Sequence, residues 1–215
     1  MRIRTVAATL LTTALLGAAA VAPSQAAPAN TGLGTKSLAE VLTSDGNQFD
    51  KNSRDYDIVT EAVLAVLGAK PDSPVGLLAD GDVALTAFIP NDASFRILTK
   101  DITGTWYRSE ADVFNALAGA VGIDAIETVL LYHVVPGATI TAKQALASDG
   151  AALTTAQGGS FTVDVLYKRL PLVQLKDADT NDTDPFLNPY ALDINKGNKQ
   201  IAHGIFLVLR PIDLP

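Results

Sequence analysis

Hydrophobic residues recur every three or four positions in the segment that follows residue 36, which is the spacing of helices that cover a core. Residues 37–40 (SLAE) have the form of a capping box and predict a short helix that begins there. Residues 58–67 place their apolar side chains on one face of a second helix, for which Asp55 or Asp57 is the predicted cap.

A short apolar run then changes the pattern. Residues 83–89 are rich in β-branched and aromatic side chains and are closed by Pro90, which predicts a buried strand. Asn91 or Asp92 is the predicted cap of a helix that runs through Leu98. The stretch of Gly, Pro and Asp residues over positions 71–82 predicts a loop ahead of the strand.

Two more helices are predicted over residues 110–118 and 123–133. Ser109 resembles the first residue of a capping box. Gly119 and Gly122 lie between the two apolar runs and predict a break there.

Beyond Pro136 the apolar residues alternate with polar ones, which is typical of strands. The predicted strands cover residues 151–155, 160–166, 170–175, 190–194, 200–202 and 205–209. Gly158-Gly159 suits a hairpin turn between the first two strands. Helices that come early and strands that come late predict an α+β fold, and the absence of an internal repeat predicts one domain over residues 37–215.

The amino-acid composition excludes several kinds of chemical site and argues against one class of partner. The 215 residues include no Cys and two His, which excludes disulfides, thiolate catalysis and a three-His zinc site. A formal net charge of −7 argues against nucleic acid as a partner, because phosphate neutralisation supplies most of that affinity. No G-x-S-x-G or H-E-x-x-H motif occurs, so we expect no enzyme.

The first 26 residues have the layout of a secretory signal peptide. Arg2 and Arg4 precede an uncharged run of Ala, Leu and Val, and residues 24–26 (SQA) fit a cleavage site. The run is shorter than the ~20 residues of a spanning helix, so we expect cleavage, no membrane span in the product and secretion from a bacterial cell. Residues 27–36 are small and polar and predict a flexible tail.

Three segments resemble the fasciclin (FAS1) family. They are residues 86–95 (TAFIPNDASF), residues 131–137 (LYHVVPG) and residues 195–215. The positions that carry the resemblance are Thr86, Phe88, Pro90, Asn91, Asp92, Phe95, Tyr132, His133, Pro136, Gly137, His203, Gly204 and Pro211. The resemblance implies a single β-wedge with several helices packed on it, an extracellular location and a role in adhesion without catalysis.

Two features depart from the family pattern. Phe206 stands where many relatives have a polar residue, and residues 165–189 resemble an insertion in a hairpin. The signature residues themselves have structural interpretations. Asn91 and Asp92 can cap a helix, and a partly buried His133 or His203 needs a hydrogen-bond partner for each ring nitrogen.

The insertion contains four Asp and one Asn within residues 177–184. Asp177, Asp179, Asn181 and Asp182 offer the oxygen ligands that calcium prefers. The Gly and the closing Glu of an EF-hand are missing, so a solvated acidic hairpin tip is the alternative. No other cofactor is indicated.

Three functions from different classes remain open. The first is a monomeric secreted adhesion or interaction module that binds an extracellular or cell-surface protein or glycan. Its candidate contact residues are Trp106, Tyr107, Arg108, Asp182 and Asp184. Trp106 can equally lie half-buried in the core. The second is a carrier of an apolar small molecule, which requires an apolar pocket. The third is a hydrolase with paired carboxylates, although no spacing selects a pair.

Overall fold

A computed structural model describes residues 32–44, 46–167 and 172–212. The predicted signal peptide and residues 27–31 lie outside these ranges. The helices are α1 (Leu38–Leu42), α2 (Asp57–Ala69), η1 (Pro74–Ala79), α3 (Asp92–Thr103), α4 (Glu110–Tyr132) and α5 (Ala142–Ala147). The strands are β1 (Leu85–Pro90), β2 (Val134–Pro136), β3 (Ala152–Thr154), β4 (Ser160–Tyr167), β5 (Leu172–Lys176), β6 (Phe186–Leu187) and β7 (Gln200–Phe206). The predicted α+β class is confirmed.

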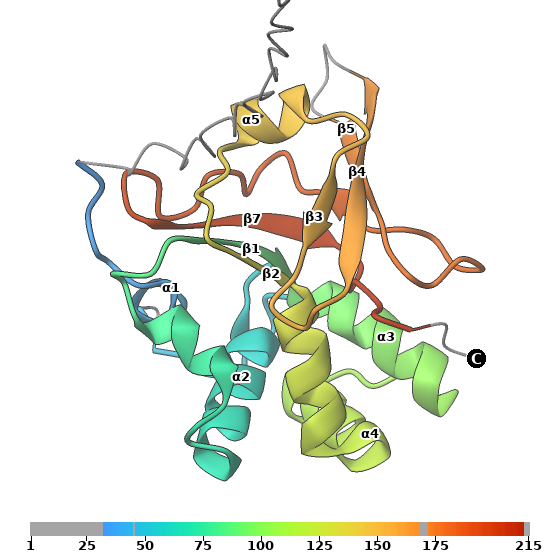
Figure 1. The fold of residues 1–215 in the computed structure, drawn as a ribbon. Helices are drawn as coiled ribbons and strands as arrows, with labels where there is room; N and C mark the ends of the chain where they lie inside the picture. Colours follow the sequence, from blue (N-terminus) through green and yellow to red (C-terminus); the bar gives the residue numbers. More distant parts are fainter. Residues whose placement is uncertain (1–31, 45, 168–171, 213–215) are drawn as a thin grey trace, which may run out of the picture. The chain divides into compact units, whose positions relative to one another are not determined.

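The strands of the described residues form one sheet in the order β2-β1-β7-β6-β5-β4-β3 (Figure 1). β1 pairs in parallel with β7, with Leu85 opposite Gln200, and the other pairs are antiparallel. Every residue of β1 is buried, as expected of a strand that is covered on both faces. β1 and β7 therefore form the centre of the domain.

The two faces of β1 serve two hydrophobic cores. Leu85, Ala87 and Ile89 belong to a cluster that they share with the helices. Phe88 belongs to a second cluster, which contains side chains of β4 and β5 such as Phe161 and Leu175. The alternation follows from the strand period of two, which sends successive side chains to opposite faces. The sheet also curls, since the N–H of Ala156, just after β3, donates to the carbonyl of Val134 in β2 at 2.7 Å.

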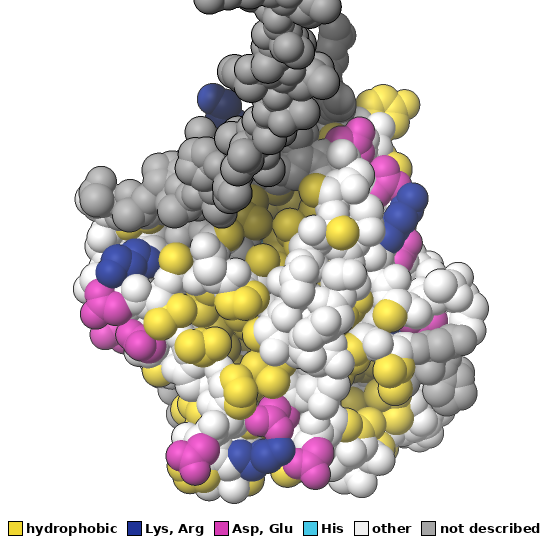
Figure 2. Space-filling model, in the orientation of Figure 1, with side chains coloured by type: hydrophobic (Ala, Val, Ile, Leu, Met, Phe, Trp, Pro, Cys, Tyr) yellow, Lys and Arg dark blue, Asp and Glu magenta, His cyan; other side chains and the backbone are white. Residues whose placement is uncertain are grey.

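The larger helices lie on one side of the β1–β7 pair, and α5 lies on the other (Figure 1). α4 is broken at Gly122, whose φ of 77° and ψ of 168° are not helical. The predicted pair of helices is thus one long element with an interruption at the predicted glycine. Figure 2 shows hydrophobic side chains spread over the helical part of this face, with most charged side chains near its margins.

By length and composition alone, α4 is the one described helix that could cross a membrane. Its interruption at Gly122 and its contacts with α2 and α3 place it in the helical layer of the domain.

Part of the predicted tail is bonded to the domain. Gly34 pairs with the 197–199 turn, because its N–H donates to Gly197 at 2.8 Å and its carbonyl accepts from Lys199 at 2.9 Å. The amide of Asn195 donates to the carbonyl of Lys36 at 2.7 Å. The expectation of a flexible tail is therefore wrong for residues 34–36, because hydrogen bonds to residues 195–199 hold this segment against the domain.

Several boundaries also differ from prediction. Residues 190–194 form turns and a single bridge instead of a strand, and the two strands expected over 200–209 are one, which ends at Phe206. η1, β2, α5 and β6 were not predicted. These elements have two to six residues, too few to display a hydrophobic period, and they owe their shape to the neighbours on which they pack.

Candidate functional site

An apolar pocket of about 330 Å³ lies between α2, α3, α4 and the segment that follows β7. Its lining consists of Ile58, Ala62, Phe95, Leu98, Ile102, Phe114, Leu117, Val121, Ala125, Ile126, Thr128, Val129, Leu130, Val208, Leu209, Arg210, Pro211 and Ile212. Small-molecule sites in proteins commonly measure ~300–1,000 Å³ and are mostly apolar. The pocket has the size and the lining of such a site.

The break in α4 shapes this pocket. Val121 and Ala125 line it from opposite sides of Gly122, so both halves of α4 contribute to the wall. Gly122 has the positive φ that glycine adopts without strain. Phe95 and Pro211, two positions of the family resemblance, also line the pocket. The sequence indicates the break but not the cavity, because a cavity depends on how far three packed helices stand apart.

Arg210 is the charged residue of the lining, and carboxylates engage its guanidinium. Nη2 lies 2.5 Å from Asp101 Oδ2, and Nη1 lies 3.2 Å from Asp179 Oδ2. Asp182 forms a third ion pair with Nη1. Because Asp101, Asp179 and Asp182 already pair with the guanidinium, we do not expect Arg210 to bind an anionic ligand in the pocket.

The same contacts fold the acidic insertion against the domain. Asp177 accepts from the backbone N–H groups of Arg210 at 2.7 Å and Asp179 at 2.9 Å. Asp184 accepts from the N–H of Asp177 at 3.1 Å. Burial raises the pKa of Asp177 to about 6. Arg210 thus supplies positive charge to this loop, and calcium binding by Asp177, Asp179, Asn181 and Asp182 stays a prediction.

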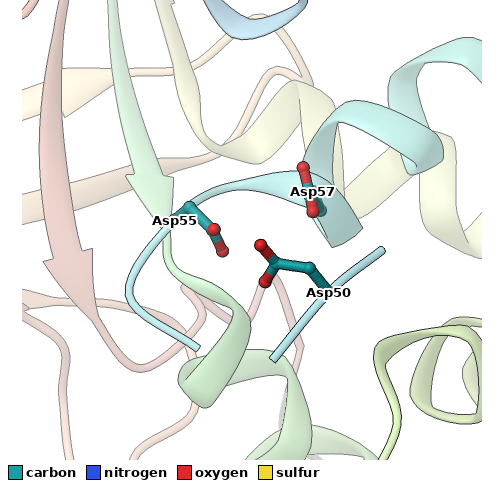
Figure 3. A group of neighbouring side chains, drawn as sticks. All are labelled: Asp50, Asp55 and Asp57. Atoms are coloured by element: carbon teal, nitrogen blue, oxygen red, sulfur yellow. The ribbon is translucent and has the colours of Figure 1, made fainter. Parts of the chain in front are cut away.

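A second cluster of carboxylates, which the sequence pattern did not indicate, gathers where three helices begin. Asp50, Asp55 and Asp57 point toward one another (Figure 3), and one carboxylate oxygen of each lies within 4.8 Å of the others. Asp55, Asp92 and Glu110 form another such group. Asp57, Asp92 and Glu110 are the first residues of α2, α3 and α4. The free N–H groups and the dipole of each helix stabilise negative charge there.

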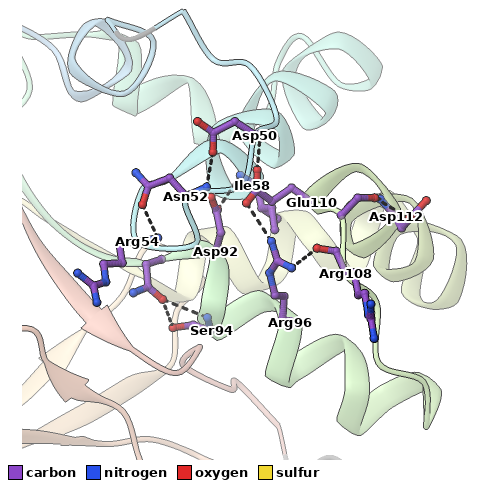
Figure 4. A network of polar contacts seen from close by, with 12 residues as sticks. Asp50, Asn52, Arg54, Ile58, Asp92, Ser94, Arg96, Arg108, Glu110 and Asp112 are labelled. Carbon is purple, nitrogen blue, oxygen red and sulfur yellow. Dashed lines mark hydrogen bonds and ion pairs between the residues drawn. The ribbon is translucent and has the colours of Figure 1, made fainter.

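Backbone and side-chain hydrogen bonds connect this cluster (Figure 4). Asp92 Oδ1 accepts from the N–H of Ile58 at 2.9 Å, and Glu110 accepts from the N–H of Asp50 at 2.7 Å and from Arg96 Nη2 at 3.0 Å. Burial, and next the neighbouring Asp55 carboxyl, raise the pKa of Asp92.

This network corrects one prediction and confirms another. The cap of α2 is not Asp55 or Asp57, because Tyr56 occupies the cap position without a side-chain bond and Asp92 supplies the acceptor. Asn91 does cap α3, since its Oδ1 accepts from the N–H of Ser94 at 3.1 Å.

The two histidines of the family resemblance are buried and bonded to the backbone. His133 Nδ1 lies 2.7 Å from the carbonyl of Val129, and Nε2 accepts from the N–H of Leu209 at 3.0 Å. Burial lowers the pKa of His133 to about 4. His203 lies in the middle of β7, where Nδ1 accepts from the N–H of Asp193 at 3.2 Å and Nε2 lies 2.8 Å from the carbonyl of Ile140. Burial also lowers the pKa of His203. Each imidazole is therefore held in one neutral tautomer and joins backbone segments.

Other signature residues also make contacts within the fold. Tyr132 donates to the carbonyl of Ser160 at 2.7 Å, and Thr86 donates to the carbonyl of Ala138 at 2.7 Å. The Phe88 ring lies edge-on to Phe161, with centroids 5.1 Å apart. Gly204 allows Tyr56 to pack closely against β7, because a Cβ at position 204 would lie 2.5 Å from the Tyr56 hydroxyl. Pro90 ends β1, Pro136 ends β2, and Gly137 turns the chain with a φ of 81°.

The 106–108 segment lies between α3 and α4. Trp106 exposes 56% of its surface and belongs to neither core cluster. Tyr107 packs against the helical core, and Arg108 is exposed with its carbonyl bonded to Arg96. Phe206, at the end of β7, is 43% exposed. Trp106 and Arg108 are thus the members of the predicted contact segment that face solvent.

Comparison with known proteins shows a structural likeness to solved structures. No protein-family model and no curated protein matches the chain. Among solved structures, it is similar to a FAS1 domain pair from the insect cell adhesion molecule fasciclin I, with a TM-score of 0.49 and 16% sequence identity. The match covers 71% of this chain and 46% of that chain, so this chain spans less than half of that structure. The similarity is one of fold.

Proposed function

We propose that this chain is a secreted, non-enzymatic binding protein that carries a small apolar molecule in the pocket between α2, α3 and α4. The observation that carries the proposal is the pocket itself, with a volume of about 330 Å³ and a lining of aliphatic and aromatic side chains. Of the two binding functions that the sequence leaves open, this is the one that requires such a pocket.

The chemistry of the wall limits the ligand. The Thr128 hydroxyl already donates to the carbonyl of Asp124 at 2.9 Å, and the Arg210 guanidinium is paired with carboxylates. A charged ligand would lose its hydration without gaining a partner, so the ligand is neutral. A dry cavity of ~150 Å³ accommodates benzene. The larger volume here suits a neutral molecule bigger than a single aromatic ring, such as a fused-ring compound or a short acyl chain.

The first test is direct. Organic extracts and native mass spectra of the exported protein should contain an apolar compound in a fixed ratio to protein. The protein without this compound should bind a fluorescent apolar probe such as N-phenyl-1-naphthylamine, and the probe should be displaced when the compound returns. Protein that purifies clean and binds no probe would contradict the proposal.

A pair of variants on α4 sharpens the test. Ala125→Trp fills the pocket, since Ala125 is part of the lining, and should reduce probe binding at least tenfold. Ala120→Trp is the matched control, because Ala120 is exposed on the same helix and is not part of the lining. Far-UV circular dichroism and urea unfolding should be alike for both. Equal probe binding by the two variants would place the probe elsewhere.

A second function, adhesion to a cell-surface or extracellular protein or glycan, is favoured by one further observation. Trp106 and Arg108 are both exposed in the segment between α3 and α4, and both residue types are frequent anchors of interfaces. Trp106→Ala should abolish saturable retention of the monomer on cells of its source. Tyr190→Ala is the control, since Tyr190 is 94% exposed and distant in sequence. Equal retention of both variants would remove Trp106 from the contact.

A further inference from the structure

The acidic cluster at the start of α2, α3 and α4 concentrates negative charge in a partly enclosed place. Asp57, Asp92 and Glu110 are buried, Asp55 is half-buried and Asp50 is exposed. Asp55 belongs to both groups of three carboxylates whose oxygens lie within 4.8 Å of one another. The cluster therefore runs from the exposed Asp50, which lies beside Asp55 in Figure 3, to the buried Asp92, with Asp55 shared by both groups.

Two oxygens in this cluster are buried without a hydrogen-bond partner in the described part of the chain. They are Asp92 Oδ2 and Asp55 Oδ1. Asp92 has no exposed surface, and its other oxygen is already engaged by the N–H of Ile58. A buried carboxylate oxygen without a donor costs free energy unless a proton or a cation satisfies it. Arg96 does not fill this role, because its Nη1 is bonded to the carbonyl of Arg108, its Nη2 is bonded to Glu110 Oε1, and its buried Nε makes no hydrogen bond within the described residues.

We propose that the space between Asp55, Asp92 and Glu110 binds one calcium ion, with Asp50 and Asp57 on its outer side. Calcium takes oxygen ligands at ~2.3–2.6 Å, so two ligands on opposite sides of the ion stand ~5 Å apart. Oxygens within 4.8 Å of one another can therefore surround one ion. The exposed Asp50 provides the route of entry.

The donor set selects calcium among the common metals. The cluster holds carboxylates and no imidazole or thiolate, which disfavours zinc and copper. Magnesium requires a near-octahedral shell at ~2.0–2.1 Å and keeps several waters. The five carboxylates come from one loop and three helix ends, and calcium tolerates such an irregular arrangement.

This site is separate from the Asp177–Asp184 loop and from the apolar pocket. In the loop, Asp179 and Asp182 are paired with Arg210. An ion in the cluster instead bridges the first turns of three helices and the 50–55 segment. Calcium should therefore raise the unfolding temperature of the whole domain, since it binds the folded arrangement only.

The test uses the full chain, stripped with EDTA and titrated with calcium chloride in a calorimeter at pH 7. We expect one ion per chain and an unfolding temperature that rises by several degrees. Magnesium at the same concentration should bind at least tenfold more weakly. Absence of calcium binding at millimolar concentration, or equal binding of the two metals, would overturn the proposal.

Variants locate the ion. Asp55→Asn should abolish calcium binding, and Asp92→Asn should do the same while keeping an oxygen for the N–H of Ile58. Asp112→Asn is the matched control, because Asp112 is an exposed acid in the first turn of α4 outside the cluster. Asp182→Asn tests the other loop. Loss of binding in Asp182→Asn alone would move the ion to that loop and overturn the assignment.

A shared proton is the competing explanation for the two buried oxygens. In that case Asp55→Asn and Asp92→Asn would raise the unfolding temperature in EDTA, and calcium would change nothing in the wild type. In the calcium case the wild type in calcium is the most stable of the three proteins. The unfolding temperatures of the EDTA-treated variants also establish that each variant folds.

Discussion

The carboxylate of Asp92 accepts a hydrogen bond from the backbone N–H of Ile58 at 2.9 Å, so the first residue of α3 caps the first turn of α2. Asp92→Ala should lower the free energy of unfolding in EDTA by about 1–2 kcal/mol, the usual cost of a lost cap. Asp92→Asn should lower the free energy of unfolding much less, since the amide oxygen can still accept the hydrogen bond from the N–H of Ile58. Urea unfolding measures both, and equal losses would show that the bond contributes nothing.

Gly81 lies against the chain that enters α1. A Cβ on Gly81 would stand 1.7 Å from the backbone oxygen of Thr35, so a side chain must displace that segment. Gly81→Ala should destabilise the domain by about 2–3 kcal/mol, as overpacking does. Gly68→Ala is the control, because nothing lies within 4 Å of its added Cβ in α2. It should gain up to ~1 kcal/mol from helix propensity. Similar free energies of unfolding for the two variants would contradict the close packing of Gly81 against the Thr35 backbone.

His133 should stay neutral far below the usual range of histidine. Burial lowers its pKa from 6.5 to about 4, so between these values the unfolded chain binds a proton that the folded chain does not. Stability contributed by this group is therefore full above pH 6.5 and falls as pH decreases to 4, by about 3 kcal/mol in all.

The ring proton resonances of the folded protein measure this directly. The resonance of His133, assigned by its absence in His133→Gln, should not shift until about pH 4. In urea unfolding, the wild type should lose more stability than His133→Gln between pH 7 and pH 4.5. The comparison cancels the opposite contributions of acids such as Asp177. Titration near pH 6.5 would contradict the buried, backbone-bonded state.

Arg210 should be important for stability as the partner of the acidic insertion. Arg210→Gln removes the guanidinium that pairs with Asp179, whose side chain is 1% exposed, and should cost about 3 kcal/mol. Lys199→Gln breaks a pair with Asp82 whose side chains are 29% and 76% exposed, and should cost less than ~1 kcal/mol. Equal costs in thermal unfolding would mean that the Arg210 contacts are no better than a surface pair.

The sequence predicts the helices and strands better than it predicts the tertiary contacts between them. The capping box at Ser37, the strand before Pro90 and the break at Gly122 follow from local signals that the backbone obeys. The cap of α2 cannot be predicted from local signals, because its acceptor is the side chain of Asp92, which belongs to another helix. The pocket and the acidic cluster escape prediction for the same reason, since each is assembled from segments that only packing brings together. A hint was present in the acids at the first helical positions, which the N-termini of helices favour.

The parallel pairing of β1 with β7 has a consequence for how the chain acquires its fold. Residues 85–90 find their central partner only in residues 200–206, so the middle of the sheet stays open while everything between them is being synthesised. Pairings between such distant segments are slow to form, because a long loop must close before any contact offsets its entropy. The two central strands of the sheet can therefore pair only after residues 200–206 have been synthesised, so the sheet is completed late in folding.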